Sequence, residues 1–160
     1  MKRMLGILGG TLAVLLAVAL PARPAGAEPV ADEAQFLVLL NQVRAEKGAR
    51  PLVSEGQLVN VARTWSGTMA AESKLYHNDN MPNQVTNWRM VGENVGVGSS
   101  ALQLHNAFVA SPRHYENIIE PAFDSVGIGV VEADGQIWVT FVFKQSKTGA
   151  VAAAPKPAPA

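Results

Sequence analysis

A glycine-rich stretch, GENVGVG (Gly92 to Gly98), raises the question of whether this chain binds phosphate, although an acid, Glu93, stands at its second position. A P-loop needs a lysine and a hydroxyl residue after its glycines, and a dinucleotide-binding loop needs Gly-x-Gly-x-x-Gly. Here the glycines stand at positions 92, 96 and 98, no lysine is near, and the Glu93 carboxylate would repel a phosphate. We therefore interpret the stretch as a short strand whose last glycines allow a turn or a close backbone approach.

Cysteine chemistry is excluded, because the chain contains no cysteine. This rules out a thiol nucleophile, a metal site made of cysteines and an anchor through a lipid-modified cysteine. A domain of this size can bury an adequate core without disulfides, so their absence is compatible with export.

The first 27 residues have the three parts of a secretory signal peptide. Lys2 and Arg3 give a positive start, the segment from Leu5 to Leu20 is apolar, and small residues at 25–27 suit a signal peptidase. The alternative is an uncleaved membrane anchor, but the apolar run is shorter than the ~20 residues that a spanning helix needs. We expect a secreted mature chain that begins at Glu28 and has no transmembrane anchor.

The mature chain is weakly acidic. Loss of Lys2, Arg3 and Arg23 leaves 10 of the 13 basic residues against 13 acidic ones, a net charge of −3. Such a domain lacks the basic surface that nucleic-acid binding requires. Residues 146–160 are rich in alanine and proline and are expected to form a disordered tail. One folded domain is therefore expected over residues 28–145.

Apolar periodicity predicts four helices in this domain. They cover residues 32–48, 54–70, 99–111 and 111–119. Asp32 can cap the start of the first helix and Gly48 its end, while Ser54 and Gln57 have the spacing of a capping box for the second.

Two strands follow the helices, at residues 126–132 and 137–143, around a turn that contains Asp134 and Gly135. Residues 77–90 are polar and show neither the helical nor the strand period of apolar residues, which is typical of a long loop with a function. Helices first and an antiparallel hairpin last indicate the α+β class.

Several aromatic and histidine side chains have two interpretations. Trp65 and Trp138 lie on core-facing periods and are expected to pack, whereas Trp88 in the polar loop either contacts a ligand or pins the loop. His105 shares a helix face with apolar residues, so we expect a partly buried histidine satisfied by backbone or water.

Four segments in a fixed order resemble the CAP family, named for cysteine-rich secretory, antigen 5 and pathogenesis-related proteins. They are LYHN (75–78), GENVG (92–96), AFVASPRHYENII (107–119) and FDSVGIGVV (123–131). The chain is most similar to the bacterial branch without cysteines, whose domains are also called SCP domains. The resemblance covers residues 33–144 and implies a three-layer α-β-α sandwich with a small antiparallel sheet and a cleft on one side.

The resemblance also implies a set of cleft residues. The family lines its cleft with two histidines and two glutamates, which His77, His114 and Glu93 match in this chain. At the fourth position many eukaryotic members have a glutamate where this chain has Ser111. Asn94 follows the family pattern and is expected to fix the cleft wall, as is Asn117. Tyr115 either lends a hydroxyl to the cleft or packs.

Two imidazoles and a carboxylate are reasonable ligands for Zn²⁺, with one position left for water. The alternative is a metal-free site in which Glu93 accepts hydrogen bonds from both His77 and His114. Ser111, His114 and Glu93 are also of the residue types that serve as nucleophile, base and orienting acid in a catalytic triad. However, the chain has no G-x-S-x-G elbow, and Ser111 before Pro112 is more simply a helix N-cap.

The resulting hypothesis is a secreted, non-catalytic binding module whose His/Glu cleft recognises an extracellular ligand or a cell-envelope component and binds a divalent metal weakly. The alternative from another class is a weak hydrolase, metal-dependent or of the serine type, that uses the same cleft. A third hypothesis is a structural protein tethered in the wall by its tail.

Overall fold

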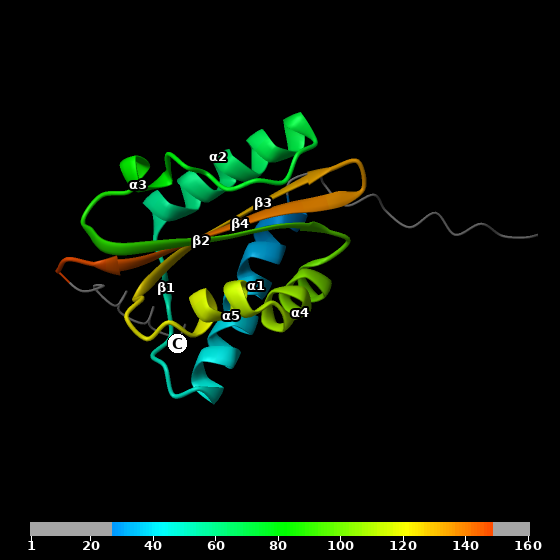
Figure 1. The fold of residues 1–160 in the computed structure, drawn as a ribbon. Coiled ribbons are helices and arrows are strands. Elements are labelled where there is room, and N and C mark those ends of the chain that lie inside the picture. The colour runs from blue at the N-terminus through cyan, green and yellow to red at the C-terminus, as the bar shows by residue number, and fades with distance from the viewer. Residues whose placement is uncertain (1–26, 149–160) are drawn as a thin grey trace, which may run out of the picture.

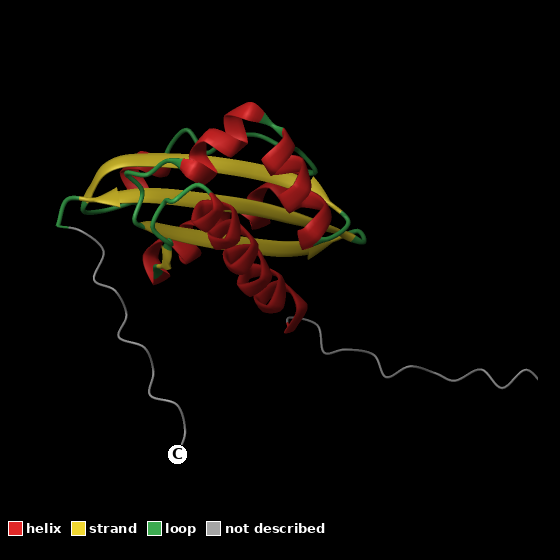
Figure 2. Ribbon diagram, turned by 90° about the horizontal axis from the view of Figure 1, so that it is seen from below, coloured by secondary structure: helices red, strands yellow, loops and turns green. Residues whose placement is uncertain are grey.

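Helices cover both faces of one mixed sheet in the computed structural model, which describes residues 27–148 (Figures 1 and 2). The helices are α1 (Ala27–Glu46), α2 (Gly56–Glu72), α3 (Met81–Gln84), α4 (Ala101–Ala110) and α5 (Pro112–Ile119). The strands are β1 (Val53–Ser54), β2 (Trp88–Gly98), β3 (Ser125–Ala133) and β4 (Gln136–Ser146). The predicted signal peptide up to residue 26 and the predicted tail from residue 149 lie outside the described residues.

The sheet has the strand order β1-β3-β4-β2, so β2 is an edge strand. The long strands β2, β4 and β3 are antiparallel, and only the two-residue β1 pairs in parallel, with β3. The predicted α+β sandwich is therefore confirmed, with one short parallel pair added to the antiparallel sheet. The hairpin turn is also confirmed, since Asp134 and Gly135 both have positive φ, 51° and 71°.

Alternation along the strands assigns each face to a helix layer. On β3, Val126 and Ile128 belong to the core cluster that also contains α1, α4 and α5 residues. The intervening Gly127 and Gly129 face α2, where a Cβ atom would collide with helix backbone. Glycine at these two positions therefore lets α2 lie directly on the sheet.

A buried arginine of α1 binds backbone carbonyl oxygens from other segments of the chain. Arg44 is 0% exposed, and its guanidinium donates to the carbonyl oxygens of Arg50 (2.8 Å), Ile118 (2.8 Å), Glu120 (2.9 Å) and Phe123 (3.2 Å). Three of these carbonyls lie at the end of α5 or in the connection to β3. One side chain thus satisfies backbone acceptors that helix termination leaves unpaired.

Two predicted helix starts are wrong. Helix α1 begins at Ala27, ahead of the predicted Asp32 cap. Helix α2 has Glu55 as its N-cap, with no side-chain cap hydrogen bond. The oxygen of Gln57 instead accepts from the backbone N–H and the hydroxyl of Thr86, at 3.1 and 3.0 Å. A contact with a segment 29 residues away replaces the local capping box.

The segment predicted as a loop, residues 77–90, contains the one-turn helix α3 and the start of β2. Buried Met81 and Val85 anchor it against α2. Four helical residues are too few to produce a visible period, which is why the sequence pattern missed them. The indole N–H of Trp88 donates to the carbonyl oxygen of Pro82 at 3.1 Å, so this side chain pins the loop.

The folded part also extends past the predicted boundary at residue 145. Ser146 ends β4 and is buried, and its N–H and hydroxyl both donate to the carboxylate of Asp124, at 2.9 and 2.8 Å. Lys147 N–H still donates to the carbonyl of Asn87 at 2.9 Å. Within residues 27–148, no helix has the length and apolar character needed to span a membrane.

Candidate functional site

Glu93 is the centre of the candidate site. It lies on β2 opposite Val142, on the sheet face covered by α2, and its side chain is only 6% exposed. Its Oε1 lies 2.8 Å from Nδ1 of His77 and 3.0 Å from the backbone nitrogen of Asn78. A carboxylate oxygen accepts, and Nδ1 of His77 donates in this contact when that nitrogen carries the hydrogen.

The second oxygen of this carboxylate is unsatisfied. Oε2 of Glu93 is buried and has no hydrogen-bond partner among the described residues. Buried polar atoms are nearly always paired, and a water molecule or an ion is a common partner of an atom that has no donor within the chain. Glu93 therefore presents one occupied and one free acceptor.

The connection after α2 brings His77 to this carboxylate. Ser73 ends the helix in the left-handed region, with φ 50°, and turns the chain back. The indole N–H of Trp65 then donates to the carbonyl of Tyr76 at 3.0 Å, and the two rings make an edge contact at 4.8 Å. His77 follows directly, and its side chain is 59% exposed. The site thus pairs a buried carboxylate with a solvent-facing imidazole.

His114 lies on α5, in the other helix layer. Its ring makes an edge contact with Phe108, with ring centroids 4.9 Å apart. Burial, and secondly electrostatic repulsion from His77, lower the pKa of His114 below its ordinary value. The lowered pKa favours a neutral ring at neutral pH.

The two histidines do not both bond to Glu93. His77 does, while the second hydrogen bond comes from the backbone of Asn78 and not from His114. Within the described part of the chain, no three histidine, aspartate or glutamate side chains form a group that could hold a metal ion. The metal set of His77, Glu93 and His114 remains a prediction.

Asn94, the residue after Glu93, points to the opposite face and joins β2 to α5. It is fully buried, its Nδ2 donates to the carbonyl of His114 at 3.0 Å, and its Oδ1 accepts from Asn117 at 2.8 Å. Asn117 also donates to the carbonyl oxygen of Glu93 at 3.2 Å. The two amides fix the strand and the helix relative to each other, and the Asn94 side chain is used inside the protein.

Ser111 occupies the N-cap position of α5, as the Ser-Pro pair predicted, but its side chain makes no cap hydrogen bond. Among residues 27–148 its hydroxyl forms no hydrogen bond to His114, and that of Tyr115 forms none to the site. The serine, histidine and acid are therefore not linked into a proton relay in this structure.

His105 departs from its prediction in one respect. It is buried, at 7% exposure, but its Nδ1 has no hydrogen-bond partner in the described chain. Burial lowers the pKa of His105.

The role of Asn78 was missed at the level of the sequence. Its backbone N–H holds Glu93, and its Nδ2 donates to Oε1 of Gln84 at 2.8 Å. Its place beside His77 in the LYHN segment was the available signal.

Comparison with known proteins identifies the family of this chain. The model of the cysteine-rich secretory protein family (CAP) matches residues 37–143. The curated protein YkwD of Bacillus subtilis (strain 168) is 29% identical over 117 residues, which cover 68% of this chain and 45% of YkwD. The chain thus spans less than half the length of that relative.

Solved structures show the same fold at low identity. An extracellular SCP-domain protein of Bacillus anthracis superposes with a TM-score of 0.70 at 19% identity, covering 80% of this chain and 45% of that one. An outer surface protein of Borrelia burgdorferi gives a TM-score of 0.68 at 17% identity, covering 73% of this chain and 94% of that one. Two solved proteins with this fold are thus described as extracellular or outer-surface proteins.

Proposed function

Because this chain belongs to the CAP, or cysteine-rich secretory protein, family, we propose that it is a secreted binding module that recognises an extracellular ligand or a cell-envelope component through Glu93 and His77. The signal peptide predicted over residues 1–27 supports export. The extracellular and outer-surface proteins that share the fold support the same location.

The free Oε2 of buried Glu93 is the observation that carries this proposal. A ligand that donates a hydrogen bond to this oxygen removes the cost of leaving it buried and unpaired, which is about 1–3 kcal/mol. The bonds from His77 and Asn78 already fix the carboxylate, so little conformational entropy is lost when the ligand binds.

Zn²⁺ binding is part of the proposal, at low affinity. The donor types fit, since two imidazoles and a carboxylate are usual zinc ligands. The arrangement fits less well, because these side chains do not form a three-residue group in residues 27–148. His77, Glu93 and His114 are the residues that would hold the ion.

Sedimentation with purified cell envelopes tests the binding function. We expect the mature protein to co-sediment, Glu93→Gln to lose most of this binding, and Glu132→Gln to retain it. Glu132 is an exposed acid near the hairpin turn and serves as the matched charge control. Equal sedimentation of the two variants would overturn the proposed role of Glu93.

Two further assays separate the parts of the proposal. Calorimetric titration of Zn²⁺ into the wild type and a His77→Ala/His114→Ala double variant measures the metal component, and saturable binding lost in the variant supports it. Ester and peptide libraries tested with Ser111→Ala and Glu93→Gln address hydrolysis. Activity that both substitutions abolish would replace the binding function with the hydrolase alternative.

A further inference from the structure

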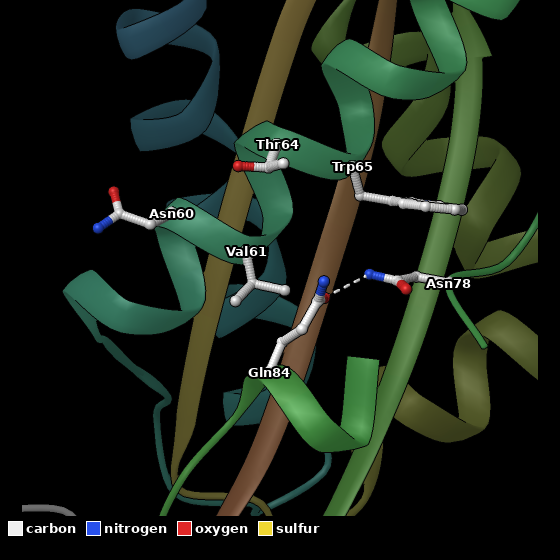
Figure 3. A pocket seen from close by; sticks show the side chains of 6 residues that line it. All are labelled: Asn60, Val61, Thr64, Trp65, Asn78 and Gln84. Atoms are coloured by element: carbon white, nitrogen blue, oxygen red, sulfur yellow. Dashed lines mark hydrogen bonds between the residues drawn. The ribbon is translucent and has the colours of Figure 1, made fainter. Parts of the chain in front are cut away.

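A pocket lies beside α2, and its lining includes Asn78, whose backbone N–H donates to Glu93. It has a volume of about 220 Å³ and opens between α2, α3 and the segment at residue 78 (Figure 3). Its lining side chains are Asn60, Val61, Thr64, Trp65, Asn78 and Gln84. We propose that this pocket binds a neutral sugar ring of an extracellular glycan.

The charge of the lining selects the class of ligand. All six side chains are uncharged, so the pocket offers no counter-ion to a phosphate, a carboxylate or an amine. Four of the six carry an amide or a hydroxyl, so the lining combines carbon surface with groups that can hydrogen-bond a ligand. A neutral ligand with many hydroxyl groups and some C–H surface fits both properties, and a pyranose ring has them.

The free hydrogen-bonding groups match such a ligand. Asn78 Nδ2 donates to Gln84 Oε1, and Asn78 Oδ1 accepts from the N–H of Asn80, but the Nε2 donors of Gln84 are unused among the described residues. The Asn60 amide and the Thr64 hydroxyl also lack partners within residues 27–148. Amides and hydroxyls that both donate and accept suit sugar hydroxyls, which do the same.

The aromatic wall is fixed before any ligand arrives. Figure 3 shows the Trp65 ring and Val61 beside the bonded amides of Asn78 and Gln84. The only polar atom of the indole already donates to the Tyr76 carbonyl, so Trp65 offers ring carbons to the pocket. A flat apolar ring beside polar groups is a common way to combine stacking with orientation in a ligand site.

The rigidity and size of the pocket favour a small ligand. Asn78 is held on three sides, by Glu93 through its N–H, by Gln84 and by Asn80. Such pre-organisation lowers the entropy lost on binding. The volume is below the roughly 300–1,000 Å³ that encloses drug-sized ligands, which suits about one ring, and one ring in an open pocket suggests a Kd of about 1 mM.

Titration of ¹⁵N-labelled protein with two neutral disaccharides tests the proposal. N,N′-diacetylchitobiose and cellobiose share their linkage and differ in the acetamido groups. We expect saturable shifts of the Trp65 indole signal and of the Asn78 and Gln84 side-chain amide signals. Binding of both disaccharides assigns recognition to the ring, and binding of the first alone assigns it to the acetamido group. No movement of these signals with either sugar overturns the proposal.

Two pocket variants and one control locate the binding. Gln84→Met removes the free donors with little change of shape, and we expect the Kd to rise about tenfold, the effect of losing one good hydrogen bond. Gln136→Met makes the same change at an exposed residue at the start of β4 and should leave the Kd unchanged.

Thr64→Trp fills the pocket from an exposed position of α2 and keeps the test valid if Gln84→Met weakens the fold. Binding that survives Thr64→Trp unchanged would place the sugar elsewhere and refute the inference. Asn78 also bonds to Glu93, so its signal alone could report a ligand at either place. The substitutions at Gln84 and Thr64 leave His77 and Glu93 unchanged, and their effect on the Kd separates this inference from the function proposed above.

Discussion

The substitution Arg44→Met removes the most deeply engaged charged group of the fold. Its guanidinium is fully buried and serves four carbonyl oxygens, of which those of Ile118 and Glu120 belong to the end of the helix that carries His114. Burial, and secondly repulsion from Arg50, lower the pKa of Arg44, in keeping with a cation held mainly by backbone dipoles.

The expected magnitude follows from which carbonyls water can reach. The bonds to Ile118 and Phe123 are buried, whereas those to Arg50 and Glu120 are partly exposed and can be replaced by water. Two buried carbonyls left unpaired cost about 1–3 kcal/mol each. Methionine fills much of the space of the arginine stem, and removal of a buried charge recovers some desolvation energy. We expect a net loss of about 3 kcal/mol in the free energy of unfolding.

Urea denaturation of Arg44→Met and Arg50→Met measures this difference. Arg50 has a 56% exposed side chain and lies 3.9 Å from Asp124, so its substitution should cost less than about 1 kcal/mol. Hydrogen exchange supplies a second readout, since amides near the end of α5 should exchange faster only in Arg44→Met. Losses for the two variants that agree within about 0.5 kcal/mol would refute the assignment of Arg44 as the clamp of α5.

Two other predictions concern Glu93 and the two histidines whose pKa is lowered, His105 and His114. Glu93→Ala should destabilise the fold by about 1–3 kcal/mol, because Asn78 N–H and His77 lose their acceptor, and an unchanged melting temperature would show that these bonds contribute nothing. Burial lowers the pKa of both His105 and His114, so the unfolded state binds their protons more tightly than the folded state. Stability should therefore be constant above about pH 6.5 and decrease as the pH falls from there toward the lowered values of the folded protein. Urea titrations between about pH 8 and 5 should show a smaller decrease in His105→Gln, and an identical pH profile would contradict the role of burial.

Local patterns were sufficient for most elements of the fold. The apolar periods of α2, α4 and α5 and the alternation around Asp134 and Gly135 identify helices and a hairpin, since these signals need only neighbours in sequence. Prediction failed where a distant partner decided the outcome. Gln57 bonds to Thr86 and not to its own helix, and Ser146 joins the last strand because Asp124 binds it.

The candidate site was likewise only partly predictable from the sequence. The motifs identified Glu93, His77 and His114 by residue type and order. They could not show that His77 and the backbone of Asn78 take the same oxygen, or that His114 stays apart beside Phe108. Those contacts depend on how α2 and α5 pack on opposite faces of the sheet.

Sequence alone therefore determined the four longer helices, the hairpin and the family, because propensity and period act between residues a few positions apart. Tertiary structure alone decided that Glu93 faces α2 while Asn94 faces α5, since alternation places neighbours on opposite faces but does not say which helix covers each face. It also decided the burial of Arg44, whose charge can be stabilised only by carbonyls that lie up to 79 residues away in the chain.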